Sequence, residues 1–265
     1  MRHARHHVTY PVTLNERLYA IVLGPLLVVA LMWVAFAFYP GVAPESGSVS
    51  FGTILIASFY TCMRLLIAYA FAIVVAVPLA LAVTSSRAVE AVLLPVFDIL
   101  ESVPILALFP VVIMLFVRFG DLNGAAIFIL FLSMLWNIVF TLVGGLKIIP
   151  HDIIDAAHIF GLRGWSFLRR LILPAIFPQF VTGSILAVAQ GWNLIIVAEV
   201  LHTYIPGGTS AQDLFGVGSI LVAAAANAQN NTFLGAVFVM VVLIALLNLL
   251  VWQKLLHYAQ RFRFE

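Results

Sequence analysis

The sequence predicts an all-α membrane protein with about six transmembrane helices and with both termini in the cytoplasm. Of its 265 residues, 64% are hydrophobic and 9% are charged, so there are too few polar side chains to cover a water-soluble fold of this size. Several windows reach the roughly 20 apolar residues that a helix needs to cross a bilayer. We expect a multi-pass membrane protein.

Six apolar windows are candidates for the spans. They are residues 18–39, 65–86, 91–117, 122–146, 171–198 and 232–252. The third window contains Pro95, Pro104 and Pro110, and proline interrupts helical hydrogen bonding, so its helix need not be continuous. Residues 214–226 are apolar but too few to cross, and we expect a re-entrant or surface helix there.

The basic residues set the orientation. If the N-terminus lies inside, eleven of the thirteen Lys and Arg residues face the cytoplasm, as the positive-inside rule requires. These are Arg2, Arg5, Arg17, Arg87, Lys147, Arg163, Arg169, Arg170, Lys254, Arg261 and Arg263. Only Arg64 and Arg118 fall on the external side. A seventh span would place the C-terminal residues QRFRFE on the wrong side.

The spans divide the chain into four parts. The first window could be a secretory signal, but it is longer than a usual signal core and no A-x-A-like cleavage site follows it, so we expect it to remain. We expect a cytoplasmic tail over 1–17, a first span with an external loop over 18–50, a core over 51–256 and a second cytoplasmic tail over 257–265.

A polar stretch, DAAHIFGLRGWSFLRRLILPAIFP, separates the fourth and fifth spans on the cytoplasmic side. Pro150 stops the preceding helix, and Asp152 can cap a new one with Asp155 in a capping-box position, which predicts a short helix from about Ile153. Gly161 can end this helix in a left-handed conformation.

Apolar residues in this water-facing stretch favour a docking surface for a partner. They are Ile153, Ile154, Ala157, Phe160 and Leu162. The alternative is an amphipathic connector that lies on the lipid headgroups.

This stretch resembles a known motif. It is similar to the EAA loop of the permease subunits of binding-protein-dependent ABC importers. The family pattern is E-A-A, three residues, G, nine residues and I-x-L-P, and this chain has DAA, three residues, Gly161, nine residues and LILP. Asp155 replaces the glutamate and Leu171 the isoleucine. The matching residues are Ala156, Ala157, Gly161, Leu173 and Pro174.

The resemblance extends over about residues 55–255, through ESVPILALFP, RFG and QGWNLIIVAE. Within the importers the chain looks most similar to the nitrate, sulfonate, taurine and bicarbonate group. We call residues 152–174 the EAA-like loop.

The resemblance implies a permease subunit that is not itself an enzyme. The EAA-like loop would be a coupling helix that docks on an ATPase dimer, with contacts from Asp155, Ala156, Ala157, Phe160, Gly161, Leu173 and Pro174. A second permease subunit, identical or homologous, and an extracytoplasmic substrate-binding protein would be the other partners.

The chain itself is expected to bind no cofactor. It has no G-x-x-x-x-G-K-[ST] motif, and its lysines are Lys147 and Lys254, so ATP and magnesium would bind to the ATPase. A single cysteine, Cys62, excludes a multi-cysteine metal site. The N-terminal HARHH is interpreted as a solvated tail. The basic residues are dispersed, which argues against a nucleic-acid partner.

Three acidic residues fall within or at the ends of the windows. Asp98, Glu101 and Glu199 are functional candidates because ionised groups are costly in a membrane. Together with Pro104, the acids Asp98 and Glu101 suggest a translocation path beside the third span. Alternatively, these two acids pair with Arg87, Arg169 or another cytoplasmic-side arginine and only stabilise the fold.

Other residues could line the path. Glu199 matches the glutamate that ends the family's fifth span and could seat the binding protein or gate the path. If the substrate is an anion, Asp98 and Glu101 should lie off the path or be neutralised, because like charges repel. Uncharged candidates, for which apolar packing is the alternative role, are Asn137, Gln190, Trp192 and Asn193.

Two other classes compete with the importer. A proton-coupled secondary transporter could use Asp98, Glu101 and Glu199, but it predicts inverted repeats that the sequence does not show and leaves the EAA-like loop unexplained. An intramembrane hydrolase is disfavoured because no span contains His-Glu-x-x-His or Gly-x-Ser-x-Gly.

Overall fold

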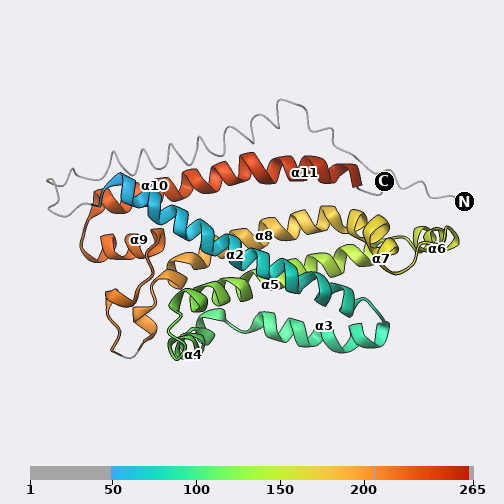
Figure 1. Ribbon diagram of the computed structural model, residues 1–265, viewed down its shortest axis with the longest axis horizontal. Coiled ribbons are helices and arrows are strands. Elements are labelled where there is room, and N and C mark those ends of the chain that lie inside the picture. The colour runs from blue at the N-terminus through green and yellow to red at the C-terminus, as the bar shows by residue number, and fades with distance from the viewer. Residues whose placement is uncertain (1–48, 206, 263–265) are drawn as a thin grey trace, which may run out of the picture. The chain divides into compact units, whose positions relative to one another are not determined.

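The computed structural model describes residues 49–205 and 207–262, which form helices joined by short connections and include no β-strand (Figure 1). These residues belong to a compact unit that begins at Gly47. The first predicted span, 18–39, lies outside the described residues.

The α-helices are α2 (Phe51–Val83), α3 (Arg87–Ser102), α4 (Ile105–Val117), α5 (Leu122–Ile148), α6 (His151–Ile159), α7 (Gly164–Phe167), α8 (Leu173–Glu199), α9 (Val217–Ala226), α10 (Asn230–Leu247) and α11 (Gln253–Ala259). Two π-helical turns, η1 (Leu168–Ile172) and η4 (Asn248–Trp252), join α7 to α8 and α10 to α11. Three short 3-10 turns are η2 (His202–Tyr204), η3 (Ser210–Gln212) and η5 (Gln260–Phe262).

Four continuous helical segments are long and apolar enough to cross a membrane. They are Phe51–Val83, Leu122–Ile148, Gly164–Glu199 and Asn230–Phe262. Each of these segments contains or largely overlaps one predicted window, and three of the four segments extend well beyond their window. The polytopic helical architecture is therefore confirmed for the described part of the chain.

The third predicted window is not one straight helix. It is divided into α3 and α4, which are bent by 85° relative to each other. Pro95 and Pro110 lie inside helices, and only Pro104 marks the break. The residue before it, Val103, is extended, with φ −68° and ψ 122°, as the clash with a following proline ring favours.

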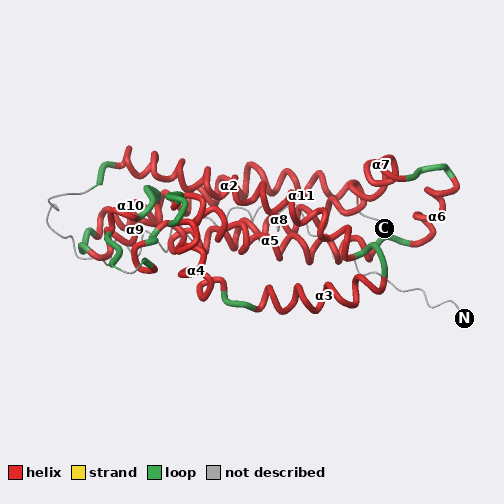
Figure 2. Tube along the Cα trace, turned by 60° about the horizontal axis from the view of Figure 1, so that its bottom comes forward, coloured by secondary structure: helices red, strands yellow, loops and turns green. Residues whose placement is uncertain are grey.

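Residues 214–226 contain the short helix that the sequence predicts. α9 covers Val217–Ala226, and its 10 residues are fewer than a crossing requires. Figures 1 and 2 place α9 and α6 at opposite ends of the bundle of long helices. The EAA-like loop and the short apolar helix therefore lie at opposite ends of the same long helices.

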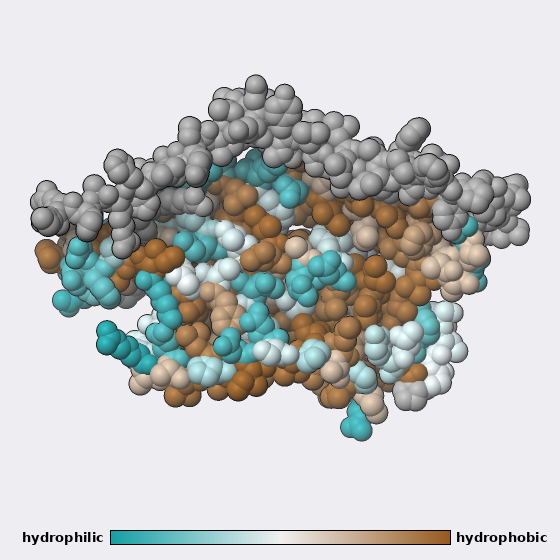
Figure 3. Space-filling view, turned by 180° about the vertical axis from the view of Figure 1, so that it is seen from behind, coloured by the Kyte–Doolittle hydropathy of each residue, from teal (hydrophilic) through white to brown (hydrophobic). Residues whose placement is uncertain are grey.

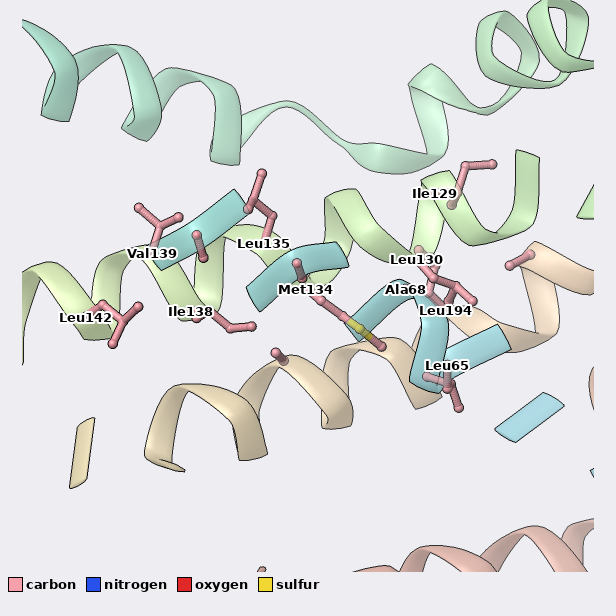
Figure 4. Packing of buried hydrophobic residues seen from close by; sticks show 14 of the residues in the cluster. Leu65, Ala68, Ile129, Leu130, Met134, Leu135, Ile138, Val139, Leu142 and Leu194 are labelled. Atoms are coloured by element: carbon pink, nitrogen blue, oxygen red, sulfur yellow. The ribbon is translucent and has the colours of Figure 1, made fainter. Parts of the chain in front are cut away.

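The core is centred on α5, which packs against α2 on one side and α8 on the other. On α2, alanines recur every fourth residue and are almost completely buried, so the backbones of α2 and α5 can approach closely. These alanines are Ala68, Ala72, Ala76 and Ala80. Figure 4 shows Met134 of α5 among the side chains of the core.

Two glycines of α8 complete this packing. A Cβ added to Gly183 would clash with the Thr141 side chain and lie 3.2 Å from the Asn137 carbonyl oxygen. A Cβ on Gly191 would clash with Met134 and lie 2.6 Å from Leu65 Cδ2. At Gly183 the space is filled by α5, and at Gly191 it is filled by side chains of α5 and α2.

We predict that Gly183→Ala loosens the contact of α5 with α8. The added methyl group has to displace Thr141 or the α5 backbone, so the free energy of unfolding should fall by about 1–3 kcal/mol. The thermal unfolding midpoint of the purified protein in detergent measures this. Gly144→Ala is the matched control, since nothing lies within 4 Å of a Cβ there. Equal midpoints for the two variants would contradict the prediction.

Candidate functional site

The EAA-like loop contains the short helix that the sequence predicts, although the helix begins earlier than expected. α6 starts at His151, and its N-cap is Pro150, whose carbonyl accepts hydrogen bonds from the amides of Ile153 (3.1 Å) and Ile154 (3.4 Å). Asp152 lies in the first turn and makes no capping hydrogen bond, so its predicted role as the cap is wrong. Pro150, with an extended backbone (φ −62°, ψ 137°), occupies the N-cap position instead.

The end of α6 is as predicted. Gly161 has a φ of +76°, and its amide donates to the carbonyl of His158 (3.0 Å), while the amide of Leu162 donates to that of Ala157 (2.9 Å). This pair of hydrogen bonds is the Schellman motif, which needs a left-handed residue. The motif turns the chain sharply and fixes the last turn of α6.

Three large apolar side chains of the EAA-like loop are highly exposed, among exposed polar and charged residues. Ile159 and Phe160 are each 84% exposed, and Trp165 is 70% exposed. Of the predicted contact residues, Asp155 and Gly161 are also exposed, whereas Ala156 is half-buried and Ala157 is buried. Ile159 and Trp165 were not singled out from the sequence, because their orientation depends on where α6 ends.

The EAA-like loop is firmly attached to a membrane span. The rings of His158 and Phe167 stack with centroids 5.1 Å apart, which joins α6 to α7. From Gly164 the chain is helical through α7, η1 and α8 up to Glu199. Leu173 and Pro174 lie at the start of α8, directly after the π-helical turn. α6 is thus fixed to one end of a 36-residue helix.

The acidic path candidates on α3 are exposed. Asp98 and Glu101 form no ion pair within the described ranges, so the pairing with Arg87 or Arg169 that the sequence allowed is not observed there. Pro104 is exposed at the bend between α3 and α4. The ion pair nearest in sequence joins Glu90 of α3 to Lys147 of α5.

The uncharged candidates separate into two groups. Gln190 and Asn193 are exposed on one face of α8, whereas Trp192 is buried and lines an apolar pocket with Tyr69 and Trp252. Asn137 on α5 is half-buried, and its side-chain amide donates to the carbonyl of Ser133 in its own helix (3.4 Å). In this structure Gln190 and Asn193 are therefore available to a solute, and Trp192 is not.

The face drawn in Figure 3 is largely hydrophobic, with hydrophilic side chains in scattered groups.

Glu199 lies in a buried polar cluster that the sequence did not predict. Its side chain is completely buried and forms an ion pair with Arg64 of α2, with Nη1 2.7 Å from Oε1. The hydroxyl of Thr61 donates to Oε1 (2.7 Å), and the amide of Gly218 donates to Oε2 (2.7 Å). We call Thr61, Arg64 and Glu199 the Arg64 cluster.

The Arg64 cluster joins four parts of the fold. Arg64 also donates from Nε to Asn123 at the start of α5 (3.0 Å) and from Nη2 to the carbonyl of Phe215 (3.0 Å). Two separate signals were present in the sequence, Glu199 as an acid at the end of a span and Arg64 within an otherwise apolar stretch. Charge counting assigned Arg64 to the external side. Its partner is 135 residues away in the chain, so periodicity could not find the pair.

A family comparison identifies the chain. Residues 68–263 match the family described as binding-protein-dependent transport system inner membrane component. The chain belongs to this family. The matched range includes the EAA-like loop, α8 and the Glu199 end of the Arg64 cluster, so all three are parts of a family permease domain.

Curated relatives agree with this assignment. The nitrate import permease protein NrtB of Synechococcus elongatus is 29% identical over 178 residues, which are 67% of this chain and 62% of that protein. The bicarbonate transport system permease protein CmpB of the same species is 29% identical over 139 residues, or 52% of this chain and 49% of that protein. The taurine transport system permease protein TauC of Escherichia coli is 25% identical over 138 residues, again 52% and 49%. For the NrtB and CmpB relatives, the matched part of this chain spans between 49% and 62% of the relative's own length.

We predict that Gly161→Val loosens the end of α6. A β-branched residue in the left-handed region costs about 1–2 kcal/mol, so hydrogen exchange at the amide of Leu162 should accelerate by about tenfold. Hydrogen–deuterium exchange with mass spectrometry measures this. Gly161→Asn is the control, because asparagine tolerates this conformation. Unchanged protection in the valine variant would show that the Schellman motif does not hold the helix end.

Proposed function

We propose that this chain is a membrane-spanning permease subunit of an ATP-driven importer. Family membership supports this reading, and it does not support the secondary transporter. The decisive structural observation is the exposed apolar pair Ile159 and Phe160, placed by α6 at the end of a continuous membrane-spanning helix. Such a surface is suited to docking on another protein.

The EAA-like loop is the proposed point of contact with a separate ATPase dimer. α6 would insert its exposed residues into a groove of the ATPase, as other amphipathic helices bind apolar grooves. Because the Schellman motif and the stack of His158 on Phe167 hold α6 against α7, movement of the ATPase would move α8 as well. α8 would then move α5, on which Gly183 and Gly191 pack without space between them.

The remaining assembly follows from the same proposal. ATP and magnesium would bind to the ATPase, and the permease chain would catalyse no reaction. Two permease subunits, identical or homologous, would enclose one path, and an extracytoplasmic binding protein would deliver the substrate. We propose six spans, counting 18–39 as the first and α3 with α4 as the third, with both termini in the cytoplasm of a bacterium.

The proposed substrate is a small anion. The relatives are named for nitrate, bicarbonate and taurine, of which the first two are anions and the third carries a sulfonate. An anion is repelled by carboxylates, whereas side-chain amides can donate hydrogen bonds to it. Gln190 and Asn193, which share the exposed face of α8, are therefore better path-lining candidates than Asp98 and Glu101.

We predict that Phe160→Asp prevents stable assembly with the ATPase. A charge buried in an apolar groove should cost 2 kcal/mol or more, equivalent to about a 30-fold loss of affinity. Copurification of the ATPase with the tagged permease measures this.

The matched control is Phe119→Asp, which alters an equally exposed phenylalanine (76% exposed) in the turn between α4 and α5. This variant should retain the ATPase. Loss of the ATPase from both variants, or from neither, would contradict docking at the EAA-like loop.

We predict that the paired substitution Asp98→Asn with Glu101→Gln leaves uptake within about twofold of the parent, because an anion avoids carboxylates. Gln190→Leu with Asn193→Leu should lower uptake by about tenfold or more, since two hydrogen-bond donors are removed. Uptake of radiolabelled nitrate, bicarbonate and taurine into cells measures both. A larger loss of uptake in the Asp98 and Glu101 variant than in the Gln190 and Asn193 variant would refute the anion path along α8.

A further inference from the structure

The loop between α8 and α9 is closed at its base by hydrogen bonds. The amide of Leu214 donates to the carbonyl of Glu199 (2.9 Å). Nδ1 of His202 lies 2.8 Å from both carboxylate oxygens of Asp213, which also accepts from the His202 amide (3.1 Å). Residues 200–205 and 207–213 therefore belong to a loop whose two ends cannot separate without breaking these bonds.

The Arg64 cluster lies directly under this base. Arg64 binds the carbonyl of Phe215 and the carboxylate of Glu199, one on each side of the closed base. Thr61 accepts from the amide of Val217 (3.0 Å) while its hydroxyl donates to Glu199. Both ends of the loop are thus attached to the same turn of α2.

The contact has no free volume in which the groups could shift separately. A Cβ on Gly216 would clash with the Glu199 carboxylate, and a Cβ on Gly218 would lie 2.7 Å from the Ile196 Cα and 2.9 Å from Glu199 Oε2. Packing this close means that displacement of the loop base has to displace Glu199, and with it the end of α8.

Stability alone is a weak explanation for such a cluster. Removing two charges from water is costly, and an apolar replacement of similar volume is often as stable. Directional, charge-assisted hydrogen bonds instead fix the relative positions of the groups that they join. Here those groups belong to α2, α5, α8 and the loop base, while the far end of α8 continues into the EAA-like loop.

The α8–α9 loop lies at the end of the long helices opposite to α6 (Figures 1 and 2), which is the external end under the proposed orientation. We infer that the Arg64 cluster transmits docking of the external binding protein from this loop, residues 200–205 and 207–213, to α2 and α8, and so to the ATPase. Thr61, Arg64 and Glu199 are positioning residues in this mechanism, since they contact neither the substrate nor ATP. The inference rests on the proposed function, because it needs an importer with a binding protein on one side and an ATPase on the other.

The test uses the whole importer in lipid nanodiscs, assembled from this chain, its ATPase and its binding protein. The ATP hydrolysis rate is measured against the concentration of binding protein that has been incubated in turn with nitrate, bicarbonate and taurine. Thr61→Val removes the hydroxyl without leaving an unpaired charge, and Glu199→Gln weakens the ion pair. Ser58→Ala is the matched control, because among the described residues this buried hydroxyl of α2 donates only to a carbonyl of its own helix, that of Ile54 (2.8 Å).

Thr61→Val is expected to lower the maximal stimulation by the binding protein about fivefold or more, as when coupling of about 1 kcal/mol between two sites is lost. The binding-protein concentration that gives half of the maximal stimulation should not change, because docking itself is intact. Thr61→Ser should restore stimulation, and Ser58→Ala should behave as the parent.

The outcomes separate the inference from the proposed function. If the parent complex is not stimulated by the binding protein, the importer proposal fails. If the parent is stimulated and Thr61→Val is stimulated equally, the inference is overturned. The inference is also overturned if Ser58→Ala loses as much stimulation as Thr61→Val, because that result would indicate a general loss of rigidity in α2. A third contrary result is a Thr61→Val variant in which only the half-saturating concentration of binding protein changes, because that would indicate a role in docking. Thr61→Val keeps the test decisive should Glu199→Gln fail to fold.

Discussion

Close packing of α5 against α8 is the contact on which the rest of the fold depends. In a membrane the hydrophobic effect does not drive helices together, so association relies on shape and on small residues that let backbones approach. Gly183 and Gly191 leave the space that Thr141 and Met134 fill. With α5 and α8 held in this way, α2 is added on the other side of α5, and the Arg64 cluster joins the three helices at one end.

The two ends of α8 have opposite character. At one end α6 exposes Ile159 and Phe160 and is attached by a ring stack and a Schellman motif. At the other end Glu199 is fully buried and holds an arginine, a hydroxyl and a backbone amide. Under the proposed function the exposed apolar pair contacts the ATPase, whereas the buried charge network fixes geometry within the chain. In that proposal α8 joins a docking surface at one end to a rigid internal contact at the other.

Local chemistry in the sequence predicted local features well. Gly161 ends α6 because few residues tolerate a positive φ, and the four long helices follow from runs of apolar residues. Features that depend on tertiary context were not predictable. Of three prolines in the third window only Pro104 breaks the helix, and the start of α6 was decided by Pro150 instead of Asp152. The pairing of Arg64 with Glu199 depends on how the spans meet, which no local pattern encodes. The family match, however, agrees with the EAA-like spacing.

The alanine face of α2 has a mechanical consequence. Alanine has no side-chain rotamers to reorder, so where Ala68, Ala72, Ala76 and Ala80 meet α5, no interlocking side chains from α2 resist relative movement along the helix axes. Small sliding of packed helices is one of the two main ways in which proteins close and open around a ligand. At these four positions α2 therefore presents a smooth surface to the core, and sliding of α2 is opposed instead by the Arg64 cluster, in which Arg64 donates to Asn123 of α5 and pairs with Glu199 of α8.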